Sequence, residues 1–93
     1  MIKEENLKIL KSLMNKYSFR ILQALSQKDM RFVELKDAVQ NERTRSLNLK
    51  NMIKAKLITK TALKRDGEII VIYKITGKGR NFFKELDKLL KYI

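Results

Sequence analysis

The sequence contains no cysteine and no histidine. Without these residues the chain has no disulfide bond, no thiolate nucleophile, no imidazole base and none of the usual zinc ligands. Its carboxylates offer no substitute, because Glu34, Asp37 and Glu42 are scattered among basic residues and suggest no catalytic pair. We therefore expect a protein that is not an enzyme and that has no catalytic residues, no metal and no cofactor.

Proline and long apolar runs are also absent. No run approaches the ~20 apolar residues that a membrane-spanning helix requires, and the opening MIKEENLKIL carries two acids, unlike a signal peptide. We therefore expect a cytoplasmic protein with no membrane partner. No linker, low-complexity tract or repeat is visible, so residues 1–93 should form one domain. A domain of this size buries only about 60 to 65% of its unfolded surface, which favours a dimer.

Acidic residues are scarce, with 10 against 22 basic ones and a net charge of +12. Between Glu42 and Asp66 there is no acid at all. The basic residues of this acid-free run are Arg43, Arg45, Lys50, Lys54, Lys56, Lys60, Lys64 and Arg65. A merely solvated lysine-rich surface would also be rich in glutamate. The run therefore favours a polyanion as partner.

Apolar residues recur at helical spacing in five segments of the chain. These segments cover about 3–14, 16–26, 33–39, 42–55 and 76–93. Asn41 and Thr76 can each cap the start of a helix, and Glu42 complements the positive end of the fourth helix. The residues of that helix expected to face inward are Leu49, Met52 and Ile53.

A β-hairpin is expected between the last two helices. Asp66-Gly67 is the strongest short hairpin signal, because a type I′ turn requires positive φ at both central positions. The flanking segments 57–64 and 68–75 are rich in Ile, Val and Thr. Tyr73 should pack the hairpin against the core. The expected fold class is therefore mainly α with one β-hairpin, an α+β architecture.

The order of these elements, together with Leu57-Ile58 and YKITGKG at 73–79, resembles the winged helix-turn-helix regulators of the MarR, HxlR and ArsR families. RFVELKDAV resembles the segment that opens their helix-turn-helix, and the likeness covers roughly residues 17–90. Two positions depart from it. Lys56 stands where these regulators usually have glycine, so it either loosens the helix exit or adopts a left-handed conformation at some cost. Arg45 falls near a position that is often apolar.

The resemblance implies a recognition helix at about 42–55 in the major groove and a wing at 58–75 on the backbone or minor groove. Arg can bond guanine, Asn can pair with adenine, and Ser or Thr can bond bases or phosphates, whereas the lysines suit phosphates. The expected DNA-binding residues are Arg43, Thr44, Arg45, Ser46, Asn48, Lys50, Lys54, Lys64 and Arg65. Leu47 either meets a thymine methyl group or is buried by a slipped helix register.

The terminal helices, at 1–15 and 76–93, are expected to form a dimer interface. Four apolar residues of the last helix recur at spacings of four, three and four, as in the seam of a short coiled coil. With the residues available opposite them, the expected interface consists of Ile9, Leu13, Phe82, Leu86, Leu89 and Ile93. Phe82 and Phe83 could also stack on bases, but their helical spacing favours core or dimer packing.

The sequence therefore predicts a homodimeric, sequence-specific protein that binds double-stranded DNA and regulates transcription. A non-specific architectural protein that coats DNA is the main alternative, because high positive charge and small size suffice for it. An RNA-binding or protein-interaction module is a third class, which the lack of an exposed aromatic platform weakens. Neither the operator sequence nor a small-molecule effector follows from the residues.

Overall fold

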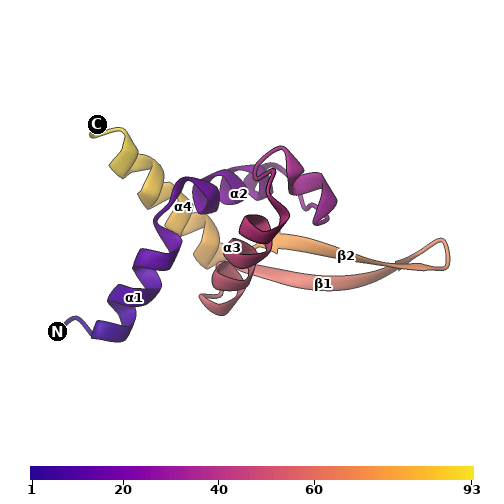
Figure 1. The fold of residues 1–93 in the computed structure, drawn as a ribbon, viewed down its shortest axis with the longest axis horizontal. Helices are drawn as coiled ribbons and strands as arrows, with labels where there is room; N and C mark the ends of the chain where they lie inside the picture. The colour runs from indigo at the N-terminus through magenta and orange to yellow at the C-terminus, as the bar shows by residue number, and fades with distance from the viewer.

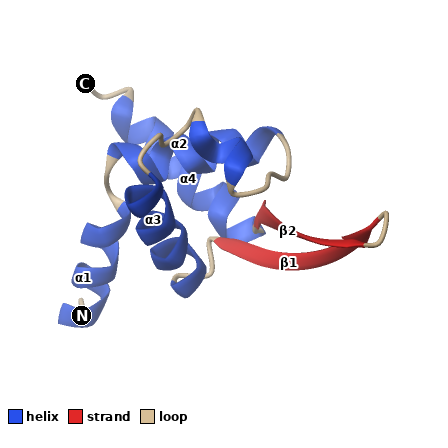
Figure 2. Cartoon of the chain, turned by 45° about the vertical axis from the view of Figure 1, so that its right-hand side comes forward, coloured by secondary structure: helices blue, strands red, loops and turns tan.

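Figure 1 shows the computed structural model, which describes all residues 1–93. Its elements in chain order are α1 (Glu4–Leu13), α2 (Lys16–Gln27), the 3-10 helix η1 (Val33–Lys36), α3 (Glu42–Lys54), β1 (Ile58–Arg65), β2 (Glu68–Ile75) and α4 (Gly77–Leu90). The helices form one body from which the hairpin projects, and both termini lie at the end opposite to the hairpin tip (Figures 1 and 2). The predicted fold class, mainly α with one β-hairpin, is confirmed. None of the helices has the length and apolar character needed to cross a membrane.

Side-chain caps set the starts of three helices. The Asn41 side chain accepts a hydrogen bond from the Thr44 amide at 2.9 Å, and the Thr76 hydroxyl accepts one from the Gly79 amide at 2.9 Å, as predicted. Asn15 caps α2 in the same way, with the Ser18 amide as donor. Such caps satisfy backbone donors that have no partner within the helix, so they fix where α3 begins.

The hairpin has the predicted turn. Asp66 and Gly67 both have positive φ, at 52° and 81°, and the antiparallel register extends from Ile58 opposite Ile75 to Arg65 opposite Glu68. A further contact was not predicted: the amides of Met30 and Tyr73 each donate to the other residue's carbonyl, at 3.1 and 2.7 Å. This bridge ties the segment before η1 to β2, and so holds the helix-turn-helix and the wing in one unit.

The core lies between α2, α3 and the base of the hairpin. Ile21 and Leu22 of α2 and Met52 of α3 are completely buried. Tyr73 is 7% exposed and packs into the same cluster, as predicted. Burial raises the pKa of the Tyr73 hydroxyl above its ordinary value, because desolvation disfavours the phenolate.

The exit from α3 explains both Lys56 and the last glycine of YKITGKG. Lys56 adopts the left-handed conformation, with φ at 63°, and the Leu57 amide closes the helix end by donating to the Met52 carbonyl at 2.9 Å. The start of α4 packs against this exit. A Cβ atom on Gly79 would collide with the Leu57 carbonyl oxygen and approach Ile75 Cγ1 to 2.9 Å. Only glycine therefore allows α4 to approach the exit so closely.

Two predicted helices are longer than the observed ones. The segment 33–39 forms a single 3-10 turn over Val33–Lys36 instead of a two-turn helix. Beyond this turn, the Val39 and Gln40 carbonyls accept hydrogen bonds from the Arg45 side chain and do not continue a helical ladder. At the other end of the chain, α4 ends at Leu90, so Ile93 lies outside the helix and is fully exposed.

Candidate nucleic-acid interface

The outer face of α3 carries one stripe of exposed side chains, which follow each other at spacings of four, three and four residues. The members of this stripe, called the α3 stripe below, are Arg43, Leu47, Lys50 and Lys54. At about 100° per residue they fall within a narrow arc of the helix. Buried Leu49 and Met52 lie on the opposite side. The stripe contains three cations and no acid, as a surface for a polyanion requires.

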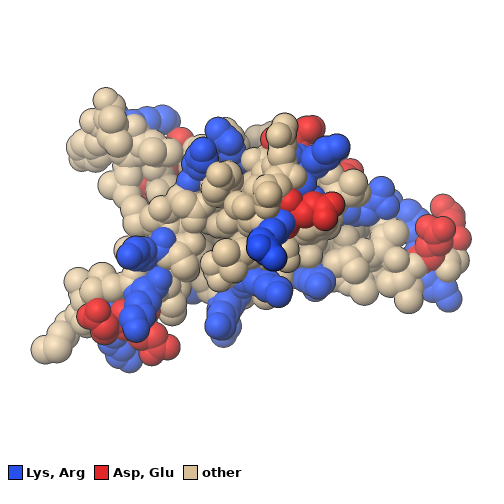
Figure 3. Space-filling view, in the orientation of Figure 1, with Lys and Arg blue, Asp and Glu red and all other residues tan.

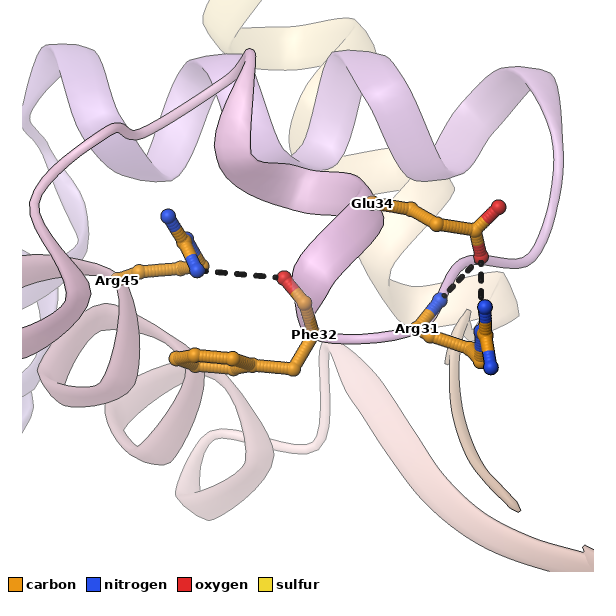
Figure 4. Close-up of polar contacts among 4 residues, drawn as sticks. All are labelled: Arg31, Phe32, Glu34 and Arg45. Atoms are coloured by element: carbon orange, nitrogen blue, oxygen red, sulfur yellow. Dashed lines mark hydrogen bonds and ion pairs between the residues drawn. The ribbon is translucent and has the colours of Figure 1, made fainter.

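Arg45 does not belong to this surface. It is 3% exposed and its guanidinium donates to the carbonyls of Val39 at 2.8 Å, Gln40 at 3.0 Å and Phe32 at 3.4 Å. The guanidinium also lies 4.6 Å from the centre of the Phe32 ring. Figure 4 shows the side chain pointing from α3 toward the segment that begins η1. The prediction that Arg45 contacts DNA is therefore wrong, because this side chain holds η1 and its following loop against α3.

Asn48 is also turned inward and is 6% exposed. Its side-chain oxygen accepts a hydrogen bond from the buried Ser18 hydroxyl at 3.0 Å, and its nitrogen donates to the Thr44 carbonyl at 2.9 Å. The predicted pairing of Asn48 with a base is therefore wrong as well: its amide links α2 to α3.

The sequence did contain a signal for the burial of Arg45. Arg45 precedes Leu49 by four residues and Met52 by seven, which places all three on one helix face. The prediction nevertheless placed Arg45 on DNA because its side chain is positively charged. Two other candidates, Thr44 and Ser46, are half-buried and flank the α3 stripe.

The two wing cations lie on opposite faces of the hairpin, because successive residues of a strand alternate. Lys64 shares its face with Lys60, which the prediction of site residues had omitted. Arg65 stands directly opposite Glu68 and lines a depression that also contains Asp29 and Glu34. Figure 3 shows basic atoms spread over the face that carries α3, with smaller groups of acidic atoms among them, and both acidic and basic atoms at the far end of the hairpin. The residues between Glu42 and Asp66 include no acid, but at the wing tip the fold brings acidic residues from other segments close to them.

The terminal helices expose apolar side chains, but not as the predicted seam. Leu13 and Leu86 are only 4% and 9% exposed, and Phe82 packs against the core. Leu13 and Leu86 belong to the core of the single chain, so the prediction of an exposed seam through these two residues is wrong, whereas Phe82 is only partly buried and its place in an interface stays a prediction. Phe83 stacks against Phe19, with ring centroids 5.2 Å apart, which agrees with core packing.

The exposed apolar residues near the two termini are instead Met1, Ile2, Leu7, Ile9, Leu10, Met14, Leu89, Leu90, Tyr92 and Ile93. Ile9, Leu89 and Ile93 of the predicted interface are among them. Only Leu13 of α1 is buried, although the helix contains ten residues. An isolated helix shorter than ~12–15 residues is marginal in water, so the packing of α1 against α3 matters for its stability.

Comparison with known proteins supplies a family and a fold. The family model described as HxlR-like helix-turn-helix matches residues 12–93. Among solved structures, the regulator YodB from B. subtilis, after diamide treatment, superposes with a TM-score of 0.82 at 17% sequence identity. That match covers 99% of this chain and 92% of YodB.

Two further solved structures are similar. A MarR-family transcriptional regulator from Enterococcus faecalis has a TM-score of 0.79 and 21% identity, over 99% of this chain and 86% of its own. A PadR-family transcription regulator from Clostridium difficile has a TM-score of 0.76 and 22% identity, over 84% of this chain and 90% of its own. No curated protein sequence matches this chain significantly. The structural likenesses show the winged helix-turn-helix fold.

Proposed function

This chain belongs to the HxlR-like helix-turn-helix family, and from this membership we propose that it is a homodimer that recognises a specific sequence of double-stranded DNA. Its family and its fold neighbours support a DNA-binding transcriptional regulator. In the proposal, α3 enters the major groove and the β1–β2 hairpin contacts the backbone or the minor groove.

The observation that carries the proposal is the α3 stripe. The stripe has three cations, one leucine and no acid, and the single acid of α3, exposed Glu42, lies outside it in the first turn. Arg43 lies in the first turn, where side chains of a recognition helix reach base edges, and its guanidinium can bond two acceptors of guanine. Lys50 and Lys54 lie farther along the helix and suit phosphate contacts.

The flanking residues and the wing complete the proposed interface. Thr44 and Ser46 can bond bases or phosphates from the two sides of the stripe. On the wing, Lys64 shares a face with Lys60, so these two lysines can approach the same phosphate strand. Arg65 is the weaker candidate, because Glu68 and the carboxylates near the depression reduce the positive potential around it.

The proposed dimer buries the exposed apolar residues of α1 and of the C-terminal segment against a second copy. A self-complementary contact of this kind is the usual way in which identical chains close a two-fold dimer. Both termini lie away from the hairpin tip (Figure 1), so a partner there would leave the tip of the wing open. In a symmetric dimer the two recognition helices should meet half-sites about 34 Å apart, one turn of DNA.

The deciding experiment selects bound sequences from random duplex DNA at near-physiological salt and then compares affinities for selected and random DNA. Enrichment of a palindrome is expected. Arg43→Ala should weaken binding to the selected site by about 1–3 kcal/mol per half-site and affect random DNA much less. The matched control is Arg20→Ala, which removes one exposed arginine from α2 and should leave the ratio of the two affinities unchanged.

An architectural, DNA-coating protein would give the opposite result. Selection would enrich no sequence, and Arg43→Ala would weaken selected and random DNA to the same degree, because phosphate contacts carry no sequence information. The net charge of +12 makes this the alternative to test. Inserting half a helical turn between the half-sites gives a second check, since a paired-helix regulator should lose its preference for the altered site.

A further inference from the structure

Leu47 is an apolar side chain in the middle of a cationic surface. It is 57% exposed and belongs to the α3 stripe, between Arg43 and Lys50. The two residues that follow it, Asn48 and Leu49, are both buried. Their burial fixes the rotation of α3 about its own axis, and in this orientation Leu47 faces outward. Of the two alternatives that the sequence left open, burial is therefore excluded.

More than half of the Leu47 side chain is left uncovered by this chain. It borders a shallow depression together with the half-buried Phe32 and the polar residues Glu42, Ser46 and Lys50. A single exposed leucine is common on protein surfaces. This one, however, lies on the helix face that points away from the core and that carries the cations of the proposed DNA interface.

We propose that Leu47 contacts the C5-methyl group of a thymine and makes the protein prefer thymine at one position of each half-site. The inference rests on the proposed function, in which α3 lies in the major groove. On the major-groove edges of the bases, the thymine methyl is the apolar group, and apolar side chains read it by direct contact. Cytosine at the same position presents an amino donor and no methyl group.

The helix geometry also places this thymine relative to the base read by Arg43. Four residues separate Arg43 from Leu47, which is a rise of roughly 6 Å along α3. Base pairs are stacked about 3.4 Å apart. The thymine should therefore lie within about two base steps of the guanine that Arg43 contacts. A half-site that contains both bases at this separation is the expected result of sequence selection.

The test removes only the methyl group. Each thymine of the selected half-site is replaced in turn by deoxyuridine, which keeps every hydrogen-bonding group, and the dissociation constant is measured by fluorescence anisotropy. At one position the loss of the methyl should weaken wild-type binding about fourfold, the effect of uncovering one apolar carbon. Replacement in both half-sites of a palindrome should weaken binding roughly 15-fold, as the two effects multiply.

Variants at position 47 identify the side chain that senses the methyl. Leu47→Ala should bind thymine and deoxyuridine DNA equally well, whereas Leu47→Met, which keeps an apolar side chain of similar size, should retain the preference. Because Leu47 is exposed, neither change should disturb folding, and circular dichroism of both variants checks this. Deoxyuridine at the other thymines, away from the Leu47 contact, is the internal control on DNA structure.

The outcomes separate this inference from the proposed function. A clear sequence preference that is insensitive to deoxyuridine, or a deoxyuridine effect that persists in Leu47→Ala, overturns the Leu47 contact and leaves the regulator intact. Absence of any sequence preference in the wild-type protein overturns both. A methyl effect that disappears only in Leu47→Ala supports both.

Discussion

Arg45→Ala should destabilise the protein strongly, although an arginine in a recognition helix is usually tested for DNA binding. The two shorter bonds of Arg45, to Val39 and Gln40, join a charged donor to carbonyl oxygens, and bonds of that kind contribute about 1.5–3 kcal/mol each. The guanidinium over the Phe32 ring adds about 1 kcal/mol. Since Gln40 is exposed and water can replace part of the loss, we expect a decrease of about 3–5 kcal/mol in the free energy of unfolding.

Urea unfolding followed by circular dichroism measures this loss. At a slope of roughly 1.5 kcal/mol per M the midpoint should fall by about 2–3 M. All variants are compared at one protein concentration, because the stability of the proposed dimer would depend on it. Arg43→Ala, in the same helix but exposed, is the matched control and should change stability by less than about 0.5 kcal/mol.

A third variant tests the geometry of the Arg45 contacts. Arg45→Lys should recover only part of the stability, since one ammonium group cannot reproduce the planar fork that reaches three carbonyls. The reasoning is refuted if Arg45→Ala costs less than about 1 kcal/mol, or if Lys restores full stability.

The remaining predictions concern the α4 packing, the dimer and the wing. Gly79→Ala should lower stability by about 3 kcal/mol in thermal unfolding, because its Cβ meets the Leu57 carbonyl, whereas Gly77→Ala, with open space around it, should be neutral. In sedimentation, the wild type should be a dimer at micromolar concentration and Leu10→Lys a monomer, with Leu63→Lys on the hairpin as a dimeric control; a monomeric wild type would contradict the interface. Lys64→Ala should reduce the slope of log K against log salt by about 0.9 per protomer, or about 1.8 for a dimer, and Arg65→Ala by clearly less; equal effects would show that the acids near Arg65 do not matter.

Much of the fold could be predicted from local signals in the sequence. Asn41, Thr76 and the Asp66-Gly67 pair each specify a backbone conformation through their own chemistry, so the start of α3, the start of α4 and the hairpin turn were predicted correctly. The errors fall where distant contacts decide the outcome. Arg45 bonds the carbonyls of the loop that follows η1, up to six residues earlier in the chain, and the bridge between Met30 and Tyr73 joins segments 43 residues apart.

The residues of the candidate site were less predictable. A charged or polar side chain is expected at the surface, but whether a given one is buried is decided by the whole fold, as Arg45 and Asn48 show. Leu86 illustrates the same limit on the apolar side. Its spacing with Phe82 and Leu89 suited an interface between two chains, yet Leu86 is buried within one. Leu86→Lys would therefore disturb the fold of the single chain, and exposed Leu10 or Leu89 is the proper place to test the dimer.

Two residues of α3 contradict a simple hydropathy pattern: Arg45 is inside and Leu47 is outside. A helix rotated to bury Leu47 would move Leu49 and Met52 toward solvent, and covering each of these side chains stabilises the fold by about 1.5–3 kcal/mol. Such a rotation would exchange one buried apolar side chain for two exposed ones. It would also leave the carbonyls that Arg45 now bonds without their donor. The roll of α3 is therefore set by its inner face, and Leu47 stays exposed in the free protein because only a partner on the outer face can cover it.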